Sequence, residues 1–179
     1  MSRVRYIVAA SLDGYIAGPN GEIDWIVQDP DIDFEERFAQ FDTFLVGRRT
    51  YETMLAFGRG TIPGKRLVVF SRSLQQADYP DVTIVGDAIA ERVAELRASS
   101  TADLWLFGGG TLFASLLGLG LVDTVEVAVI PVLLGAGLPL LPDIARRTKL
   151  QLTGHRVYEK TGIVALEYAV LSNHEGPHG

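Results

Sequence analysis

The sequence predicts an α/β sandwich with a largely parallel central sheet and an antiparallel C-terminal edge. Three observations support this fold class: apolar runs alternate with helical patterns up to residue 120, glycines follow several of the runs, and a hairpin pattern ends the chain. The chain has 179 residues, 47% hydrophobic and 21% charged, which is typical of one globular domain. We expect this domain at residues 1–172 and a polar tail at 173–179.

Strands and helices alternate through the first half of the chain. An apolar run predicts a strand at residues 4–10, and a polar loop that contains Asp13 follows it. Asp33 and Glu36 have the spacing of a capping box, which predicts a helix from residue 33 to about residue 40. Further elements expected before residue 100 are strands at 44–46, 66–70 and 82–85 and helices at 50–57 and 87–98.

The second half predicts one more helix between strands and then a hairpin. A strand is expected at residues 104–107, followed by a helix at 111–117 that Gly118 and Gly120 end. A strand at 122–130 comes next. Residues 150–168 predict two strands joined by a turn near Lys160-Thr161-Gly162. This hairpin supplies the antiparallel edge.

Composition excludes several kinds of protein. The absence of cysteine rules out disulfide scaffolds and thiolate chemistry, so redox work would need a bound cofactor. A formal net charge of −6 argues against nucleic-acid binding. The uncharged stretch at 127–142 is short and interrupted by prolines, and the apolar run at 6–12 is too short for a signal peptide. We therefore expect a cytoplasmic protein without a membrane partner and without a metal site.

Charge is segregated along the chain. Residues 47–73 contain six basic residues and one acid, whereas residues 29–42 carry a net charge of −5. Two solvated surface faces are the ordinary explanation for such runs. An anion-binding surface is the alternative, and the positions of the strand ends decide between them.

Three expected strands end in groups that suit a phosphate. Glycines 108–110 precede Thr111 at a helix start, where free amides and the helix dipole attract anions. The arginines after Gly47 add planar forks that bind phosphate oxygens in pairs. The third end is Ser71-Arg72-Ser73. Each end alone could be an ordinary turn, but the combination indicates a phosphate-bearing cofactor.

The same residues distinguish between nucleotide cofactors. Arginines favour NADP over NAD, because a 2′-phosphate needs cations where a free 2′-hydroxyl needs a carboxylate. Phe113 stands where a dinucleotide-binding fingerprint has its third glycine, so the fold is not of the Rossmann kind. Residues 58–65 resemble an ATP-binding P-loop, but the spacing of the glycines is wrong and Arg66 replaces Ser or Thr.

These motifs occur in an order that resembles the dihydrofolate reductase superfamily. The similarity is greatest to the branch formed by the reductase domain of the bifunctional riboflavin-biosynthesis deaminase-reductase. The matching segments are residues 9–18 (AASLDGYIAG), Asp24-Trp25, 46–52 (VGRRTYE), 63–66 (PGKR), 71–73 (SRS), 108–112 (GGGTL) and 131–135 (PVLLG). They cover nearly the whole chain.

The resemblance implies a three-layer sandwich that binds NADPH and forms a homodimer through its C-terminal strands. It assigns the adenosine side to Gly47, Arg48, Arg49 and Thr50, the 2′-phosphate to Ser71, Arg72 and Ser73, the pyrophosphate to Gly108, Gly109, Gly110, Thr111 and Leu112, and the nicotinamide to Ala10 and Ile16. The chain lacks the length and the cysteines for an attached zinc deaminase domain.

The source of the proton is less defined than the cofactor site. The family places a carboxylate shortly after the Trp of its substrate loop, but the acids that follow Trp25 do not align without a gap. Counting back from Gly47 favours Asp31, and Asp13 lies in the loop beside the expected nicotinamide site. Trp25 and Tyr51 are the aromatic residues expected to floor the substrate pocket.

The sequence therefore predicts an NADPH-dependent reductase of a pyrimidine- or pterin-like small molecule. The first candidate substrate is 5-amino-6-(5-phosphoribosylamino)uracil of riboflavin biosynthesis. Dihydrofolate reductase activity is one alternative. A noncatalytic NADP(H)-binding dimer is an alternative from another class.

Overall fold

The structure, a computed structural model, describes residues 1–142 and 147–171. The tail expected at 173–179, with His174 and His178, lies outside the described residues. No helix in the described ranges has the length and apolar character needed to cross a membrane.

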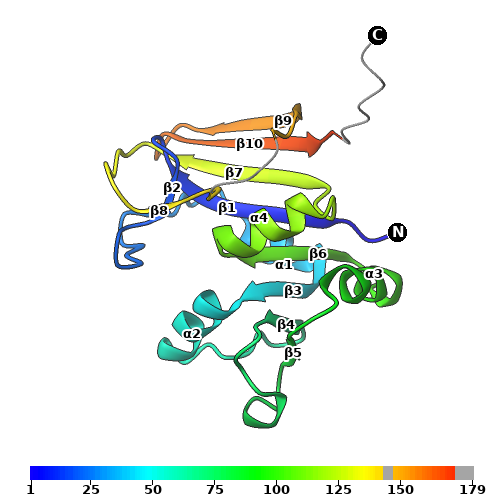
Figure 1. Cartoon of the computed structure of the whole chain (residues 1–179). Helices are drawn as coiled ribbons and strands as arrows, with labels where there is room; N and C mark the ends of the chain where they lie inside the picture. The colour runs from blue at the N-terminus through cyan, green and yellow to red at the C-terminus, as the bar shows by residue number, and fades with distance from the viewer. Residues whose placement is uncertain (143–146, 172–179) are drawn as a thin grey trace.

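The central sheet has eight strands in the order β5-β4-β3-β6-β1-β7-β10-β9 (Figure 1). Neighbouring strands from β5 to β7 are parallel, whereas β10 is antiparallel to both β7 and β9. The mostly parallel sheet and its antiparallel C-terminal edge are thus confirmed. The bounds are β1 (Val4–Ser11), β3 (Phe41–Gly47), β4 (Arg66–Phe70), β5 (Thr83–Val85), β6 (Asp103–Gly108), β7 (Thr124–Ile130), β9 (Leu150–Tyr158) and β10 (Ile163–Val170).

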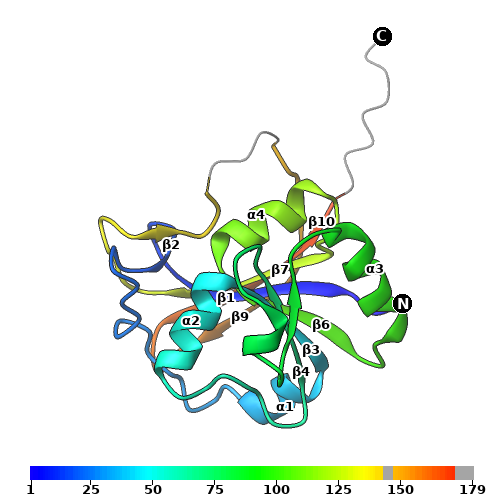
Figure 2. The same ribbon diagram turned by 60° about the horizontal axis from the view of Figure 1, so that its bottom comes forward.

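Helices cover both faces of the sheet and give the predicted three layers (Figure 2). On one face, α3 (Ile89–Ser99) and α4 (Gly110–Gly118) contribute Val93 and Phe113 to the main apolar cluster. On the other face, α1 (Phe34–Ala39) and α2 (Arg48–Ala56) contribute side chains to an aromatic cluster. The two clusters form because successive side chains of a strand point to opposite faces.

Aromatic rings fill both sides of the sheet core. Tyr6 stacks on Phe113, with 3.9 Å between ring centroids. On the opposite face, Phe44 stacks on Trp105 at 5.3 Å, and Phe38 of α1 lies 5.1 Å from Trp105. These contacts fix α1 and α4 against the strands whose ends build the site.

The helix starts follow the local chemistry of the sequence. Asp33 caps α1, because its Oδ1 accepts a hydrogen bond of 2.9 Å from Glu36 N, which confirms the predicted helix start. The helix expected at residues 50–57 begins earlier, at Arg48, since Gly47 in extended conformation is its N-cap. The hairpin turn after Tyr158 lies where the sequence predicts it.

A second, two-stranded sheet was not expected from the sequence. It joins β2 (Tyr15–Ala17) to β8 (Leu138–Pro139) in antiparallel pairing. Segments this short carry too few residues for an alternating pattern to show. The pairing holds the loop after β1 against residues 138–139, beside the N-terminus of α4.

Candidate cofactor and substrate groove

An open groove of about 1970 Å³ runs along the carboxyl ends of β3, β4 and β6. It continues over the face of β1, β7 and β10 that α1 also covers. Ligands of open α/β sheets bind at this end of the strands, and the sequence predicts the phosphate-binding groups there.

The N-termini of α2 and α4 meet at the middle of the groove. A Cβ on Gly47 would lie 3.5 Å from Gly108 O and 3.6 Å from Gly109 N, so the two turns approach each other closely. Neither helix has a side-chain cap on its first amides. Two sets of free N–H groups and two positive dipole ends therefore converge on one place.

Glycine is required in the turn between β6 and α4. Gly108 has φ +151°, a conformation that side chains with a Cβ rarely adopt, and the peptide that joins it to Gly109 is cis. A Cβ on Gly109 would lie 3.3 Å from Thr50 Oγ1, and one on Gly110 would lie 2.8 Å from Pro139 O. The turn is thus enclosed by α2 on one side and by the end of β8 and the residues that follow it on the other.

The ends of β3 and β4 are joined by Arg48. Its Nη1 donates a hydrogen bond of 3.1 Å to Ser73 Oγ, and its Nε lies 3.5 Å from a carboxylate oxygen of Glu52. The buried Ser71 hydroxyl accepts hydrogen bonds from the amides of Ser73 and Leu74. This places the two predicted phosphate-binding segments side by side.

Part of the basic stretch faces the groove and part does not. Lys65 Nζ donates to the carbonyls of Phe38 and Phe41, and Arg66 donates to Thr43 and to serines near the end of α3. These two cations are structural, so the basic stretch does not form one surface. Three exposed arginines of residues 47–73 line the groove, and their guanidinium groups have no hydrogen-bond or ion-pair partner among the described residues: Arg49, Arg59 and Arg72.

Most residues expected at the cofactor are brought together. The groove is lined by Ile16, Gly47, Arg48, Arg49, Thr50, Ser71, Arg72, Gly108, Gly109, Gly110, Thr111 and Leu112. Ala10 is 2% exposed beneath it, and Ser73 contacts it only through Arg48. We call the lining residues of the α2 start, the β4 end and the α4 start the cofactor ledge.

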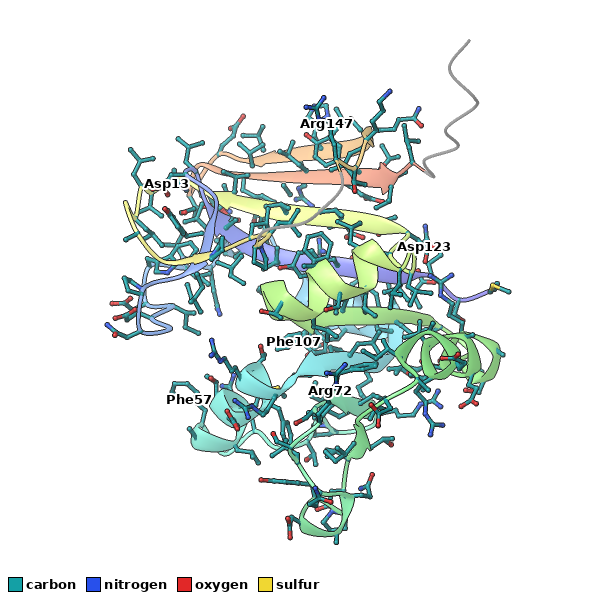
Figure 3. All side chains as sticks on the ribbon, in the orientation of Figure 1. Asp13, Phe57, Arg72, Phe107, Asp123 and Arg147 are labelled. Atoms are coloured by element: carbon teal, nitrogen blue, oxygen red, sulfur yellow. The ribbon has the colours of Figure 1, made fainter. Side chains whose placement is uncertain are left out.

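Asp13, the first of two carboxylates expected in catalysis, does not line the groove. Figure 3 shows Asp13 in the loop after β1 and, apart from it, Arg72 at the end of β4. Its carboxylate accepts hydrogen bonds from Ser11 Oγ and from the amides of Leu134 and Gly135. The Ser11 hydroxyl and the Gly135 amide hold the pKa of this carboxyl below its ordinary value, because they hydrogen-bond its charged form. These contacts join two loops.

Asp31 also lies outside the main groove. It lines a separate small hollow of about 190 Å³, and its carboxylate pairs with Lys160 Nζ at 2.8 Å. Its backbone amide donates to the carboxylate of Asp29, which in turn accepts from Thr161 Oγ1. The acidic turn is therefore fastened to the hairpin turn between β9 and β10.

The two aromatic residues expected in the substrate pocket pack beside it. Tyr51 is 3% exposed, and its ring makes an edge contact with Tyr79 at 5.6 Å. Trp25 donates from Nε1 to Glu22 O and packs on the apolar cluster under the groove. Other aromatic side chains line the groove itself, namely Phe34, Phe38, Phe57, Phe70, Trp105, Phe107 and Tyr158.

Two acids that were not predicted lie on the groove floor. Among the described residues, Glu126 of β7 and Glu167 of β10 are the acids that line it. Each is a single charge inside an otherwise apolar strand, and charged residues are rarely buried in strands unless they are paired. A single glutamate within an apolar strand pattern was therefore the sequence feature that could have identified these two acids.

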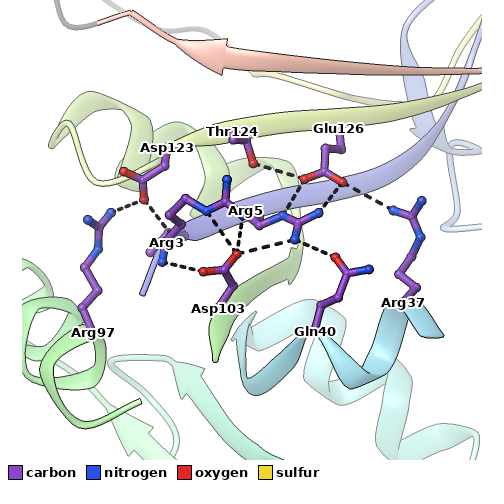
Figure 4. A network of polar contacts seen from close by, with 10 residues as sticks. Arg3, Arg5, Arg37, Gln40, Arg97, Asp103, Asp123, Thr124 and Glu126 are labelled. Carbon is purple, nitrogen blue, oxygen red and sulfur yellow. Dashed lines mark hydrogen bonds and ion pairs between the residues drawn. The ribbon is translucent and has the colours of Figure 1, made fainter. Parts of the chain in front are cut away.

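Glu126 is held by a buried ion-pair network (Figure 4). Arg5 donates from Nε and Nη2 to its two carboxylate oxygens at 2.7 and 3.0 Å, and Thr124 Oγ1 donates at 3.2 Å. Arg37 Nη1 of α1 lies 3.5 Å away. Burial lowers the pKa of Arg5, but the hydrogen bonds and charge of Glu126 outweigh this and raise it.

The uncapped amides and the arginines of the cofactor ledge fit the phosphates of a dinucleotide. Phosphate groups bind where helix amides and guanidinium groups converge. Ile16, which lines the groove, fits an uncharged ring at the other end. The groove therefore suits an elongated ligand with anionic groups at one end and a flat ring at the other.

Solved structures define the class of fold. The chain aligns with a putative riboflavin biosynthesis protein from Shewanella sp. PV-4 at TM-score 0.83 and 24% identity, over 95% of this chain and 99% of that one. A dihydrofolate reductase from Enterococcus faecalis, complexed with NADP(H) and RAB-propyl, aligns at TM-score 0.70 and 17% identity over 95% and 97%. The protein has a dihydrofolate reductase-like fold.

Sequence comparison defines the family. The sequence profile of the RibD C-terminal domain matches residues 3–164, and the chain belongs to this family. The uncharacterized protein YyaP of Bacillus subtilis (strain 168) is 33% identical over 178 residues, which cover 93% of this chain and 94% of YyaP. A Thermotoga maritima diaminohydroxyphosphoribosylaminopyrimidine deaminase/5-amino-6-(5-phosphoribosylamino)uracil reductase aligns at TM-score 0.71 and 19% identity, over 95% of this chain and 57% of that one.

Proposed function

We propose that the protein is an NADPH-dependent reductase that transfers a hydride to a pyrimidine- or pterin-like small molecule. The observation that carries this proposal is the convergence of the α2 and α4 N-termini beside Arg49 and Arg72, in a groove that continues over an apolar floor. Membership of the RibD C-terminal domain family supports it.

The cofactor ledge would hold the dinucleotide. The amides at the starts of α2 and α4 would bind the pyrophosphate, and the 2′-phosphate would lie near Arg72. When bound, the nicotinamide supplies the hydride, and this chain supplies position and a dry environment. Ile16 and the partly buried Phe107 line the groove between the ledge and the floor, where they would exclude water from the reacting atoms.

The first candidate substrate is 5-amino-6-(5-phosphoribosylamino)uracil. The Thermotoga protein of the same fold carries this reductase activity in its name. Arg59, an exposed residue of the groove, has a guanidinium group without a partner among the described residues, which suits the phosphate of such a substrate. We propose the cytoplasm as the site of the reaction, which cell fractionation would test.

The decisive experiment is a fluorescence titration with NADPH and with NADH, followed by turnover assays. We expect NADPH to bind at least about tenfold more tightly, because charge-assisted hydrogen bonds to the 2′-phosphate are absent for NADH. Equal or absent binding contradicts the proposal. NADPH oxidation with dihydrofolate instead of the ribosylaminopyrimidine would establish the dihydrofolate reductase alternative. NADPH binding without turnover of either substrate would favour the noncatalytic dimer.

We also propose that two copies associate through the C-terminal strands. β9 is an edge strand whose Leu150, Leu152 and Val157 are 43%, 52% and 57% exposed. Their register partners on β10 are Val170, Tyr168 and Val164, which are separated by even numbers of residues. The three β9 side chains therefore lie on one face of the hairpin. Sedimentation equilibrium should give a dimer mass, and Leu152→Lys combined with Val157→Lys should give the monomer mass. A monomeric wild-type protein would refute this assignment.

A further inference from the structure

Three alanines form a flat row on the floor of the groove. Ala9 of β1, Ala128 of β7 and Ala165 of β10 are register partners across three adjacent strands, and all three line the groove. Strands in a sheet lie about 4.8 Å apart, so the row is about 10 Å wide. We call these three residues the alanine row. Its width matches one or two fused aromatic rings.

The row is bordered on one side by larger side chains. The neighbouring row on the same face consists of Ile7, Glu126 and Glu167, again as register partners on β1, β7 and β10. The small side chains of the alanine row therefore lie lower than this border. A planar ring resting on the row would place its edge against the border.

Two carboxylates in this border lie directly opposite each other. Like charges at such positions destabilise a sheet unless a cation compensates them. Arg5 compensates Glu126 and uses both of its oxygens. The charge of Glu167 also acts on Arg5 across the sheet, but no hydrogen bond or ion pair is formed between them.

Glu167 thus differs from the other acid of the groove. Within residues 1–142 and 147–171, its carboxylate has no hydrogen-bond or ion-pair partner, although the residue is only partly exposed. One of its oxygens lies 3.6 Å from the point where a Cβ on Gly154 would be. A side chain at position 154 would lie in ordinary contact with the Glu167 carboxylate, so glycine there leaves this side open.

We propose that Glu167 is the residue that selects the substrate: a planar heterocycle lies on the alanine row and donates N–H hydrogen bonds from its amino-substituted edge to the Glu167 carboxylate. This inference rests on the proposed function and adds the specificity-determining residue to it. A carboxylate with two free oxygens accepts from adjacent N–H donors, as two ring or amino nitrogens present them.

The test is a calorimetric titration of the NADPH-saturated protein with two probes. One is 2,4-diaminopyrimidine, which has the N–H donors, and the other is 2,4-dimethoxypyrimidine, which has the same ring without them. We expect the wild-type protein to prefer the diamino compound and Glu167→Gln to weaken its binding at least about tenfold. Binding of the dimethoxy compound should change less than about twofold. Ala165→Val should weaken both, because it raises the floor.

Glu159→Gln is the matched control, since Glu159 is an exposed acid at the end of the same hairpin. It should behave as wild type with both probes. No preference in the wild-type protein, or unchanged binding in Glu167→Gln or Ala165→Val, would overturn the inference.

Each variant is first titrated with NADPH, and an unchanged affinity shows that the protein is folded. If the wild-type protein does not bind NADPH, the proposed function fails, and the same probes on the free protein still decide the role of Glu167.

Discussion

Asp13 and Gly135 lie 122 residues apart in sequence and are joined by a hydrogen bond of 2.7 Å from the Gly135 amide to the Asp13 carboxylate. The Leu134 amide donates to the other oxygen of the same carboxylate. The bond fastens the loop between β1 and β2, which leads directly to Ile16 of β2, to the loop after β7. Asp13 therefore positions the end of the groove where we propose that the nicotinamide binds, without lining it.

The first prediction concerns the pH dependence of this link. The folded pKa of Asp13 is lowered, so the link is fully present above about pH 4, the ordinary pKa of Asp, and is lost as the pH falls through the lowered value. The protection factor of the Gly135 amide is the intrinsic exchange rate at each pH divided by the rate measured by NMR. Between pH 6 and pH 3 it should fall in that acidic window. In Asp13→Asn this fall should be absent. A kcat that falls at least about a hundredfold in Asp13→Asn would instead establish Asp13 as a proton donor.

The second prediction concerns the glycine turn. Gly110→Ala should destabilise the protein by about 1–3 kcal/mol, because its Cβ would lie 2.8 Å from Pro139 O and 3.1 Å from Pro142 Cδ. Gly118→Ala in the same helix is the control, since its Cβ would contact nothing. It should be neutral or stabilising by up to about 1 kcal/mol. Urea unfolding measures both, and equal stability of the two variants would contradict the close approach.

The third prediction concerns the free arginine at the end of β4. Arg72→Ala should remove most of the preference for NADPH over NADH, at least about tenfold, because charged hydrogen bonds to phosphate contribute about 1.5–3 kcal/mol. Arg92→Ala is the control: Arg92 is an exposed arginine of α3 that pairs with Glu95. Its loss should leave the preference unchanged. A preserved preference in Arg72→Ala would show that Arg72 does not bind the 2′-phosphate.

The fourth prediction concerns the buried ion pair under the groove. Glu126→Met should destabilise the protein by about 3–5 kcal/mol, because it leaves the Arg5 guanidinium buried without its main partner. The double variant with Arg5→Met should be more stable than the sum of the two single changes predicts, since both charges are then removed. Urea unfolding of all four proteins gives the coupling energy. Strict additivity would mean that the pair is not coupled.

The fifth prediction concerns Asp31. If the ion pair with Lys160 describes its role, Asp31→Asn should leave kcat within about twofold of wild type, because general acid catalysis would require a loss of about a hundredfold. Asp24→Asn, a substitution at another exposed acid, is the control. A selective loss of kcat in Asp31→Asn, measured as NADPH oxidation, would show that Asp31 takes part in catalysis.

The half of the groove that we propose for the cofactor was readable from the sequence because its chemistry is local. Gly47-Arg48-Arg49 and the glycine triplet each combine a strand end, a turn and a helix start within a few residues. Hydrophobic periodicity gave the sheet, and the capping box gave α1. Local patterns of this kind persist in the structure because they depend only on backbone geometry.

The substrate half could not be read in this way because its residues are far apart in sequence. Ala9, Ala128 and Ala165 become neighbours only through the pairing of β1, β7 and β10. Lys65 also shows the difference: the charge pattern placed it with the arginines of residues 47–73, but its amine donates to the carbonyls of Phe38 and Phe41 around the end of α1. Sequence gives the charge of a residue but not its hydrogen-bond partners.

The order of the main elements, the mostly parallel sheet and the glycine turns before α2 and α4 were determined by sequence alone, since they follow from periodicity and from the conformational demands of glycine. Strand register and loop packing decided the rest: which cations remain free, which acid faces the groove without a partner, and that Asp13 and Asp31 fasten loops. Such pairings depend on contacts between residues more than 100 positions apart, and these form only when the sheet is assembled.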